Sequence, residues 1–159
     1  MRTPGEKRAK SSSIAILNEK LPGGAMKFTI PSDFAAGRQV QKAIIDEVEK
    51  HRYGHQSCFA IKLALEEALI NAIKHGNKTD PTKKVYVTAD ITDDRAQIEI
   101  EDEGPGFKRS DVPDPTCDAN LHKCSGRGIL LIEAYMTSVE WSCNGRRIKM
   151  TKINEPDPT

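Results

Sequence analysis

The sequence predicts an α+β fold, a two-layer sandwich in which helices lie on one face of a mostly antiparallel sheet. Three observations lead to this prediction. Two segments with helical periodicity follow a short strand, over residues 32–75. Two segments with apolar–polar alternation are joined by only "TDD", and a second pair flanks Asn144-Gly145. Helices and hairpins therefore come in separate groups, which is typical of α+β proteins.

The first half of the chain is predicted to form one strand and two helices. The strand "MKFTIP" (26–31) is bounded by "LPGG" and by Ser32. Ser32 or Asp33 can cap a helix that continues to about His51. A second helix is expected from about Gln56 to His75, with Gly76-Asn77 as its stop signal. The expected core positions of the first helix are Phe34, Val40, Ile44, Ile45 and Val48.

The second half is predicted to contain two hairpins with a loop and a helix between them. "KVYVTADI" (84–91) and "RAQIEIED" (95–102) form the first hairpin. After Asp102 the chain becomes rich in Gly, Pro and Asp and loses its periodicity, and we expect residues 107–125 to form a mobile lid. A short apolar helix follows over 127–136. "SVEWSCN" and "RRIKMTKI" form the last hairpin around Asn144-Gly145, a strong turn signal.

Length and composition indicate a single soluble domain. The chain has 159 residues, of which 37% are hydrophobic and 30% charged, and its net charge is +1. This balance gives no reason to expect direct binding to nucleic acid or to a membrane. No segment approaches the roughly 18 apolar residues of a membrane span. We expect a cytoplasmic protein with a flexible N-terminal segment (1–23), one domain (24–153) and a disordered tail (154–159).

The four cysteines contain no C-x-x-C pair. Cys117, His122 and Cys124 lie close together, but structural zinc normally uses four ligands in two tight pairs. We therefore expect reduced, mostly structural thiols. The sequence assigns no role to the two cysteines of the predicted lid.

A polar stripe on the second predicted helix is the first candidate site. In "EEALINAIKHGN", Glu67, Asn71 and Lys74 share one face, flanked by aliphatic residues. A carboxylate and a carboxamide four residues apart direct oxygen atoms at the same volume, which suits Mg²⁺, and Lys74 could meet a phosphate. The same stripe would also arise from simple charge pairing along a helix, which contributes only tenths of a kcal/mol.

Two glycine-rich segments are further candidates. In "EDEGPGF" the strand ends at Asp102, and Gly104 and Gly106 allow a ligand to approach the backbone; an ionised Asp could accept a hydrogen bond from a purine amine. In "KCSGRGILLI" the lid leads into a helix N-terminus, whose free N–H groups suit a phosphate. An ordinary turn and an ordinary N-cap would explain each segment alone. The candidate phosphate contacts are Lys123, Ser125, Gly126, Arg127 and Gly128.

These motifs occur in an order that resembles the GHKL ATPase superfamily, whose N, G1 and G2 boxes show this pattern and whose Bergerat fold has the predicted element order. The resemblance covers residues 24–153. "EEALINAIKHGN" and "GRGILLIEAYM" are most similar to bacterial anti-sigma factor serine/threonine protein kinases. The resemblance implies ATP and Mg²⁺ as cofactors, Glu67 as catalytic base, Asn71 as magnesium ligand, Asp102 as adenine contact and Lys74 as phosphate contact. Relatives often have Gly-Thr near the purine, where this chain has Gly145-Arg146-Arg147.

The resemblance also implies partners: a STAS-type anti-sigma antagonist that is phosphorylated on serine, a sigma factor, and a second copy of the chain as a homodimer. One alternative is a nucleotide-dependent module that sequesters a regulatory partner without phosphorylating it. A freestanding ATPase, or a fragment of a two-component kinase, is a third interpretation. It is disfavoured because the first 25 residues contain no helical segment that could carry a phosphoacceptor histidine.

Overall fold

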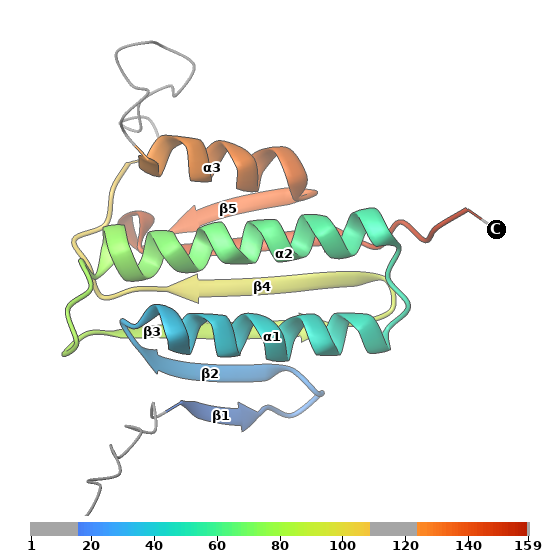
Figure 1. The fold of residues 1–159 in the computed structure, drawn as a ribbon, viewed down its shortest axis with the longest axis horizontal. Coiled ribbons are helices and arrows are strands. Elements are labelled where there is room, and N and C mark those ends of the chain that lie inside the picture. The colour runs from blue at the N-terminus through green and yellow to red at the C-terminus, as the bar shows by residue number, and fades with distance from the viewer. Residues whose placement is uncertain (1–15, 109–123, 159) are drawn as a thin grey trace, which may run out of the picture.

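The computed structural model describes residues 16–108 and 124–158. These residues form one antiparallel sheet covered on one face by helices (Figure 1). The sheet order is β1 (Leu17–Lys20), β2 (Met26–Pro31), β3 (Lys84–Ile91), β4 (Arg95–Glu101), β6 (Arg147–Ile153) and β5 (Ser138–Ser142). The helices are α1 (Phe34–Lys50), α2 (His55–Ile70), which continues into a π-helix (Asn71–Gly76), and α3 (Cys124–Tyr135). The predicted α+β sandwich is confirmed.

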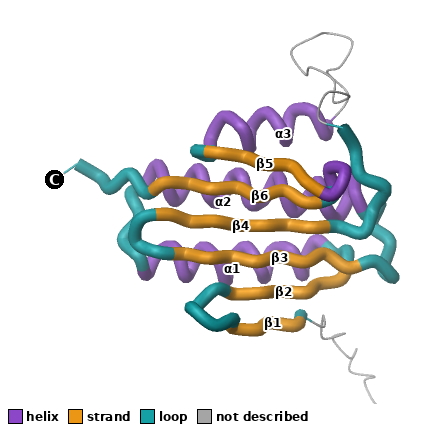
Figure 2. The backbone as a smooth tube through the Cα atoms, turned by 180° about the vertical axis from the view of Figure 1, so that it is seen from behind, coloured by secondary structure: helices purple, strands orange, loops and turns teal. Residues whose placement is uncertain are grey.

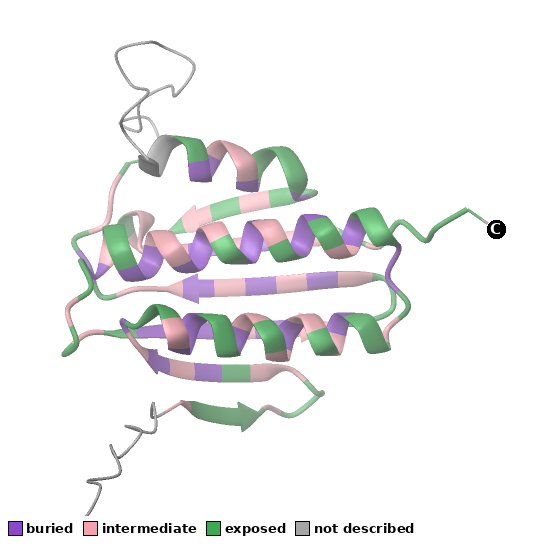
Figure 3. Ribbon diagram, in the orientation of Figure 1, coloured by how far each residue is buried: buried purple, intermediate pink, exposed green. Residues whose placement is uncertain are grey.

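The two layers follow from the alternation of the strands. In β3 and β4, every second residue is buried beneath the helices, and the paired Val87 and Ile100 illustrate the register. Figure 2 shows the opposite face of the sheet, which no described helix covers. Most of its residues are polar or charged, and Arg147 forms an ion pair with Glu101 there. Figure 3 shows that buried positions concentrate between the layers.

The first helix begins and packs largely as predicted. The side chain of Asp33 caps α1 by accepting a hydrogen bond from the backbone N–H of Ala36 at 3.0 Å. Val40, Ile44 and Val48 are buried, and Ile45 packs against the core from a partly buried position. Phe34 corrects the predicted core list, because it is 38% exposed. It is the first residue of the helix and lines a groove between α1 and α2.

The described ends of the chain are more ordered than the sequence indicates. Residues 17–20, predicted as part of a flexible segment, form β1 and pair with β2 through a turn at Gly23 and Gly24. All four residues of β1 are exposed. Their sequence, LNEK, has no alternation of apolar and polar residues that could have predicted a strand. Residues 154–157, predicted to be disordered, bond to the start of α2 through Asn154, Glu155 and Asp157.

The last helix and the two strands after it agree with the sequence except at one boundary. β5 and β6 form the predicted hairpin, with Asn144 and Gly145 at positive φ in the turn. α3 begins at Cys124, three residues before the predicted start at 127. The glycines at 126 and 128 are therefore inside the helix rather than in front of it. Among the described residues, no helix is long and apolar enough to span a membrane.

Candidate functional site

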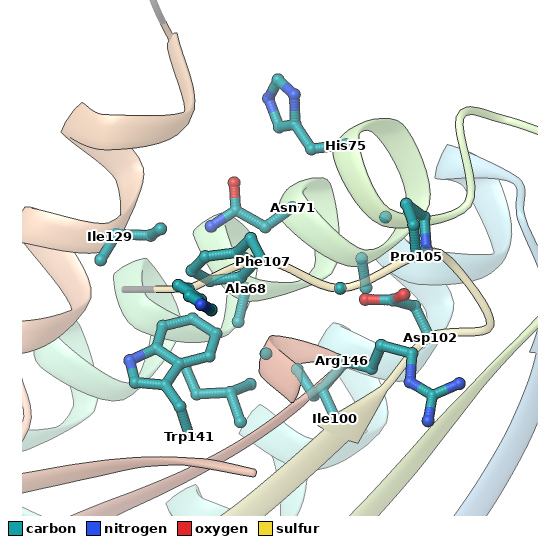
Figure 4. Close-up of a pocket in the computed structure, with 16 residues that line it drawn as sticks. Ala68, Asn71, His75, Ile100, Asp102, Pro105, Phe107, Ile129, Trp141 and Arg146 are labelled. Carbon is teal, nitrogen blue, oxygen red and sulfur yellow. The ribbon is translucent and has the colours of Figure 1, made fainter. Parts of the chain in front are cut away.

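A cavity of about 250 Å³ opens at one end of the sandwich, between the end of α2, the middle of α3, the loop after β4 and the β5–β6 turn. Figure 4 shows that polar groups from different elements face this space, among them Asn71, His75 and Asp102. Apolar side chains form the remaining walls. The residues that line the cavity are Ala68, Asn71, Ala72, His75, Gly76, Ile100, Asp102, Pro105, Gly106, Phe107, Lys108, Ile129, Trp141, Gly145, Arg146 and Ile148.

Asp102 lies at the floor of the cavity, directly after β4. Its Oδ1 accepts the backbone N–H of Gly104 at 2.8 Å, which closes a tight turn. Burial raises the pKa of Asp102, while the hydrogen bond from Gly104 and the positive charge of Arg146 act in the opposite direction. A Cβ atom at Gly76 would overlap the Asp102 carboxylate, so any other residue at that position would displace this carboxylate. Asp102 and Gly104 therefore both pack directly against the helix end at Gly76, and Gly106 also lines the cavity.

Glu67 and Asn71 lie where α2 faces α3. A Cβ atom at Gly128 would be 2.7 Å from Glu67 Oε2 and 3.6 Å from Asn71 Oδ1, so both side chains reach the backbone of α3. Asn71 Nδ2 is buried and has no hydrogen-bond partner among the described residues. Burial raises the pKa of Glu67, and the neighbouring charge of Glu66 adds to this effect. The structure thus brings three predicted residues, Glu67, Asn71 and Gly128, into one cluster.

Lys74 does not join this cluster. From Asn71 onward the helix is a π-helix, in which hydrogen bonds such as Asn77 N–H to Ala72 carbonyl span five residues. The wider turn places His75, four residues after Asn71, at the cavity. Lys74 instead lines the groove between α1 and α2. The prediction that Lys74 shares the face of Glu67 and Asn71 assumed α-helical geometry, which ends at Ile70.

The remaining predicted phosphate contacts are only partly described. Residues 109–123 of the predicted lid, which include Lys123, lie outside the described residues. Ser125 and Gly126 belong to the first turns of α3. Arg127 is exposed on the same helix, and Gly128 is buried against the Glu67 cluster.

Several site residues were not predicted from the sequence. Phe107 and Trp141 form an edge-to-face pair with ring centroids 4.9 Å apart, and both line the cavity. Arg146 also lines the cavity; its backbone carbonyl accepts the N–H of Asp102 at 3.0 Å. Arg147 points to the open sheet face and pairs with Glu101. Alternation along the last hairpin could have separated the two arginines, because neighbours in a strand face opposite sides.

The fold and the cavity define a class of protein. The family model described as "Histidine kinase-like ATPase domain" matches residues 30–152, and the chain belongs to this family. Its one-sided antiparallel sandwich is the Bergerat fold that the sequence predicted. Membership of an ATPase family implies that the chain binds ATP.

Proteins similar to this chain include anti-sigma F factors and serine-protein kinases. An anti-sigma F factor of Oceanobacillus iheyensis is 41% identical over 83 residues, which cover 50% of this chain and 56% of that protein. An anti-sigma F factor of Clostridium perfringens is 37% identical over 83 residues, 50% of this chain and 59% of that protein. The serine-protein kinase RsbW of Listeria monocytogenes is 30% identical over 111 residues, 65% of this chain and 71% of that protein. The chain thus spans a little over half the length of the anti-sigma F factors that it matches.

Proposed function

We propose that this chain is an ATP-dependent serine/threonine protein kinase that also acts as an anti-sigma factor. Its substrate would be a serine on a STAS-type antagonist, and its second partner a sigma factor. The names of the relatives support this proposal, because they include both anti-sigma factors and serine-protein kinases. The observation that carries it is the cluster of Glu67 and Asn71 against Gly128, next to the cavity whose floor holds Asp102.

The cluster has the groups that phosphoryl transfer requires of a protein. Glu67 would accept the proton of the attacking serine as the bond between the serine Oγ and the γ-phosphorus forms. At the same time the bond from the γ-phosphorus to the β–γ bridging oxygen would break, which releases ADP. A carboxylate whose pKa is raised is a stronger base than an exposed one, so the burial of Glu67 supports this role. Asp102 would accept a hydrogen bond from the adenine amine, and Phe107 and Trp141 offer an aromatic wall for the base.

A magnesium ion fits the same cluster. The carboxamide oxygen of Asn71 is a ligand of the kind that Mg²⁺ uses, and it lies with the Glu67 carboxylate at the backbone of Gly128. The unpaired Nδ2 atom is a donor and would take no part in holding the ion. The described residues contain no group of three or more His, Cys, Asp or Glu that could hold a metal. Mg²⁺ is usually bound by few protein ligands together with phosphate and water. When bound, Mg²⁺ would neutralise phosphate charge; Asn71 would hold it and Glu67 would lie beside it.

Transfer of label from Mg²⁺-[γ-³²P]ATP to candidate antagonists tests the proposal. Glu67→Gln should lower the rate by about a hundredfold or more, since it removes the base, while ATP still binds. Binding can be followed by the fluorescence of Trp141, the only tryptophan of the chain. Glu66→Gln is a matched control, because Glu66 is the exposed neighbour and faces the groove between α1 and α2. Equal transfer by wild type and Glu67→Gln would remove Glu67 from the base role. A partner that is bound in the presence of ATP and never labelled would support the sequestering module instead.

A further inference from the structure

Two of the three buried polar side chains in the described part of the protein, Ser32 and Asn77, are bonded to each other. Asn77 is completely buried, and Ser32 is 4% exposed. Asn77 directly follows the π-helix, and Ser32 lies between β2 and α1. Because burying a carboxamide is costly unless all its groups are paired, a fully buried Asn at a helix end indicates a specific task.

The hydrogen bonds of Asn77 use its whole amide. Nδ2 donates to Ser32 Oγ and to the Lys84 carbonyl, each at 2.9 Å, and Oδ1 accepts the backbone N–H of Glu103 at 2.7 Å. Ser32 in turn donates to the Lys83 carbonyl at 2.7 Å. One side chain therefore joins the helix end to three other segments: the start of β3, the β2–α1 connection and the loop after β4.

The bond to Glu103 concerns the site most directly. Glu103 stands between Asp102 and Gly104, the two residues of the turn at the cavity floor. The same loop touches the helix end at a second point, because a Cβ atom at Gly104 would overlap the carbonyl of Gly76. With Asn77 holding the backbone at 103 and glycines allowing contact on either side, the Asp102 carboxylate has a defined position relative to the π-helix.

We infer that Asn77 is a positioning residue for base recognition, acting through Asp102: its bond to Glu103 sets where the Asp102 carboxylate meets the 6-amino group of the purine. This inference rests on the proposed role of Asp102 as the adenine contact. It assigns to Asn77 an effect on the affinity for ATP and on the preference for a 6-amino purine. It gives Asn77 no part in the transfer step. Glu67 lies on α2 and Asn71 at its end, and most of the π-helix separates both of them from Asn77.

Equilibrium binding measured by Trp141 fluorescence tests the inference with two ligands: ATP, and the analogue in which hydrogen replaces the 6-amino group. Wild type should prefer ATP by about tenfold or more, the value of a hydrogen bond to a carboxylate. Asn77→Ala should lose most of this preference, and so should Asp102→Asn. The double variant should bind ATP no more weakly than Asp102→Asn alone, because the two changes remove the same interaction. Additive losses, or an unchanged preference in Asn77→Ala, would overturn the inference.

Two variants separate positioning from stability. Tyr53→Phe removes the hydrogen bond from Tyr53 Oη to the Thr92 carbonyl at the far end of the sheet, and it should lower the melting temperature with no change in base preference. Ser32→Ala removes one Asn77 partner and keeps the bond to Glu103, so it should weaken the preference less than Asn77→Ala does. If Asn77→Ala does not fold, Asn77→Ser decides: its shorter side chain also loses the bond to the Glu103 N–H, and an unchanged preference there overturns the inference. Failure of wild type to bind ATP would instead refute the nucleotide site itself.

Discussion

At the scale of single residues, close backbone contact distinguishes this site from an ordinary polar helix face. Gly76 meets the Asp102 carboxylate, and Gly128 meets the carboxylate of Glu67. Neither glycine has a positive φ, so the lack of a side chain is needed for space and not for backbone conformation. The two carboxylates proposed for base recognition and for catalysis are therefore each placed against a glycine of another element.

Gly128→Ala tests this arrangement at the catalytic end. The added Cβ would lie 2.7 Å from Glu67 Oε2, so the carboxylate must move. Since the end of a flexible side chain moves easily, we expect the melting temperature to change little. The rate of phosphoryl transfer should fall by roughly tenfold to a hundredfold, as expected when a reacting group is misplaced by about 1 Å. Gly37→Ala in α1 is the control: its Cβ would meet only Ile73 and Leu69, and transfer should be unchanged. Normal transfer by Gly128→Ala would show that the contact with Glu67 has no catalytic role.

At the scale of elements, the change from α-helix to π-helix at Asn71 decides which side chains face the cavity. In the π-helix, His75 lines the cavity and Lys74 faces α1. Burial lowers the pKa of His75, and the adjacent Lys74 charge adds to this, so the neutral imidazole is favoured at the site. π-Helical turns often occur at functional sites, where they redirect side chains without ending the helix.

A pair of alanine substitutions tests the redirection. His75→Ala should weaken ATP binding by about fivefold, the value of one hydrogen bond or a comparable contact. Lys74→Ala should change the affinity by no more than about twofold, as for an exposed residue outside the site. Both affinities can be measured by titrating Trp141 fluorescence. The opposite order of effects would mean that the helix continues as an α-helix when ATP is bound.

At the scale of the whole molecule, segments far apart in the chain stabilise one another at the end of the sheet opposite the cavity. α2 begins at an N-cap, Gly54, that has no side chain to cap it. The residues after β6 supply the missing acceptors: Asn154 Oδ1 accepts the Gly54 N–H at 3.2 Å, and Asp157 Oδ1 accepts the His55 N–H at 2.9 Å. The buried Ser57 hydroxyl bonds to the backbone of Glu155.

Truncation after Ile153 should therefore destabilise the fold without altering the cavity. Loss of one helix cap and of the partner of the buried Ser57 should together cost about 2 kcal/mol in the free energy of unfolding. Chemical denaturation measures this loss, and the affinity for ATP should be unchanged at temperatures where the variant is folded. A chain lacking only Thr159 retains these bonds and is the control. Equal stability of the two truncated chains would show that the tail contacts are not needed in solution.

The same end of the molecule contains a pH-dependent contact. His51, at the end of α1, bonds to Asp93 in the β3–β4 turn at 2.7 Å, and this bond, with a further one to Glu47, raises the pKa of His51. Because the folded-state pKa is above the unfolded value, the contribution of His51 to stability is complete below about pH 6.5 and is lost as the pH rises through the raised pKa. His51→Gln should thus reduce the melting temperature more at about pH 6 than at about pH 8.5. Asp93→Asn should weaken this pH dependence, and a constant difference at both pH values would contradict the assignment.

The sequence by itself determined the order of the helices and hairpins and the residues Glu67, Asn71, Asp102 and Gly128 of the candidate site. Periodicity, capping and turn preferences act between residues close together in the chain, so they can be inferred from a single sequence. Only the tertiary structure decided the rest. β1 exists because β2 is available to pair with it, and the tail is held by a helix about a hundred residues away. His75 replaces Lys74 at the cavity because the end of the helix widens, and Asn77 bonds to three segments whose meeting point no local pattern records. These features depend on contacts between residues far apart in the chain, and such contacts form only when the folded elements pack together.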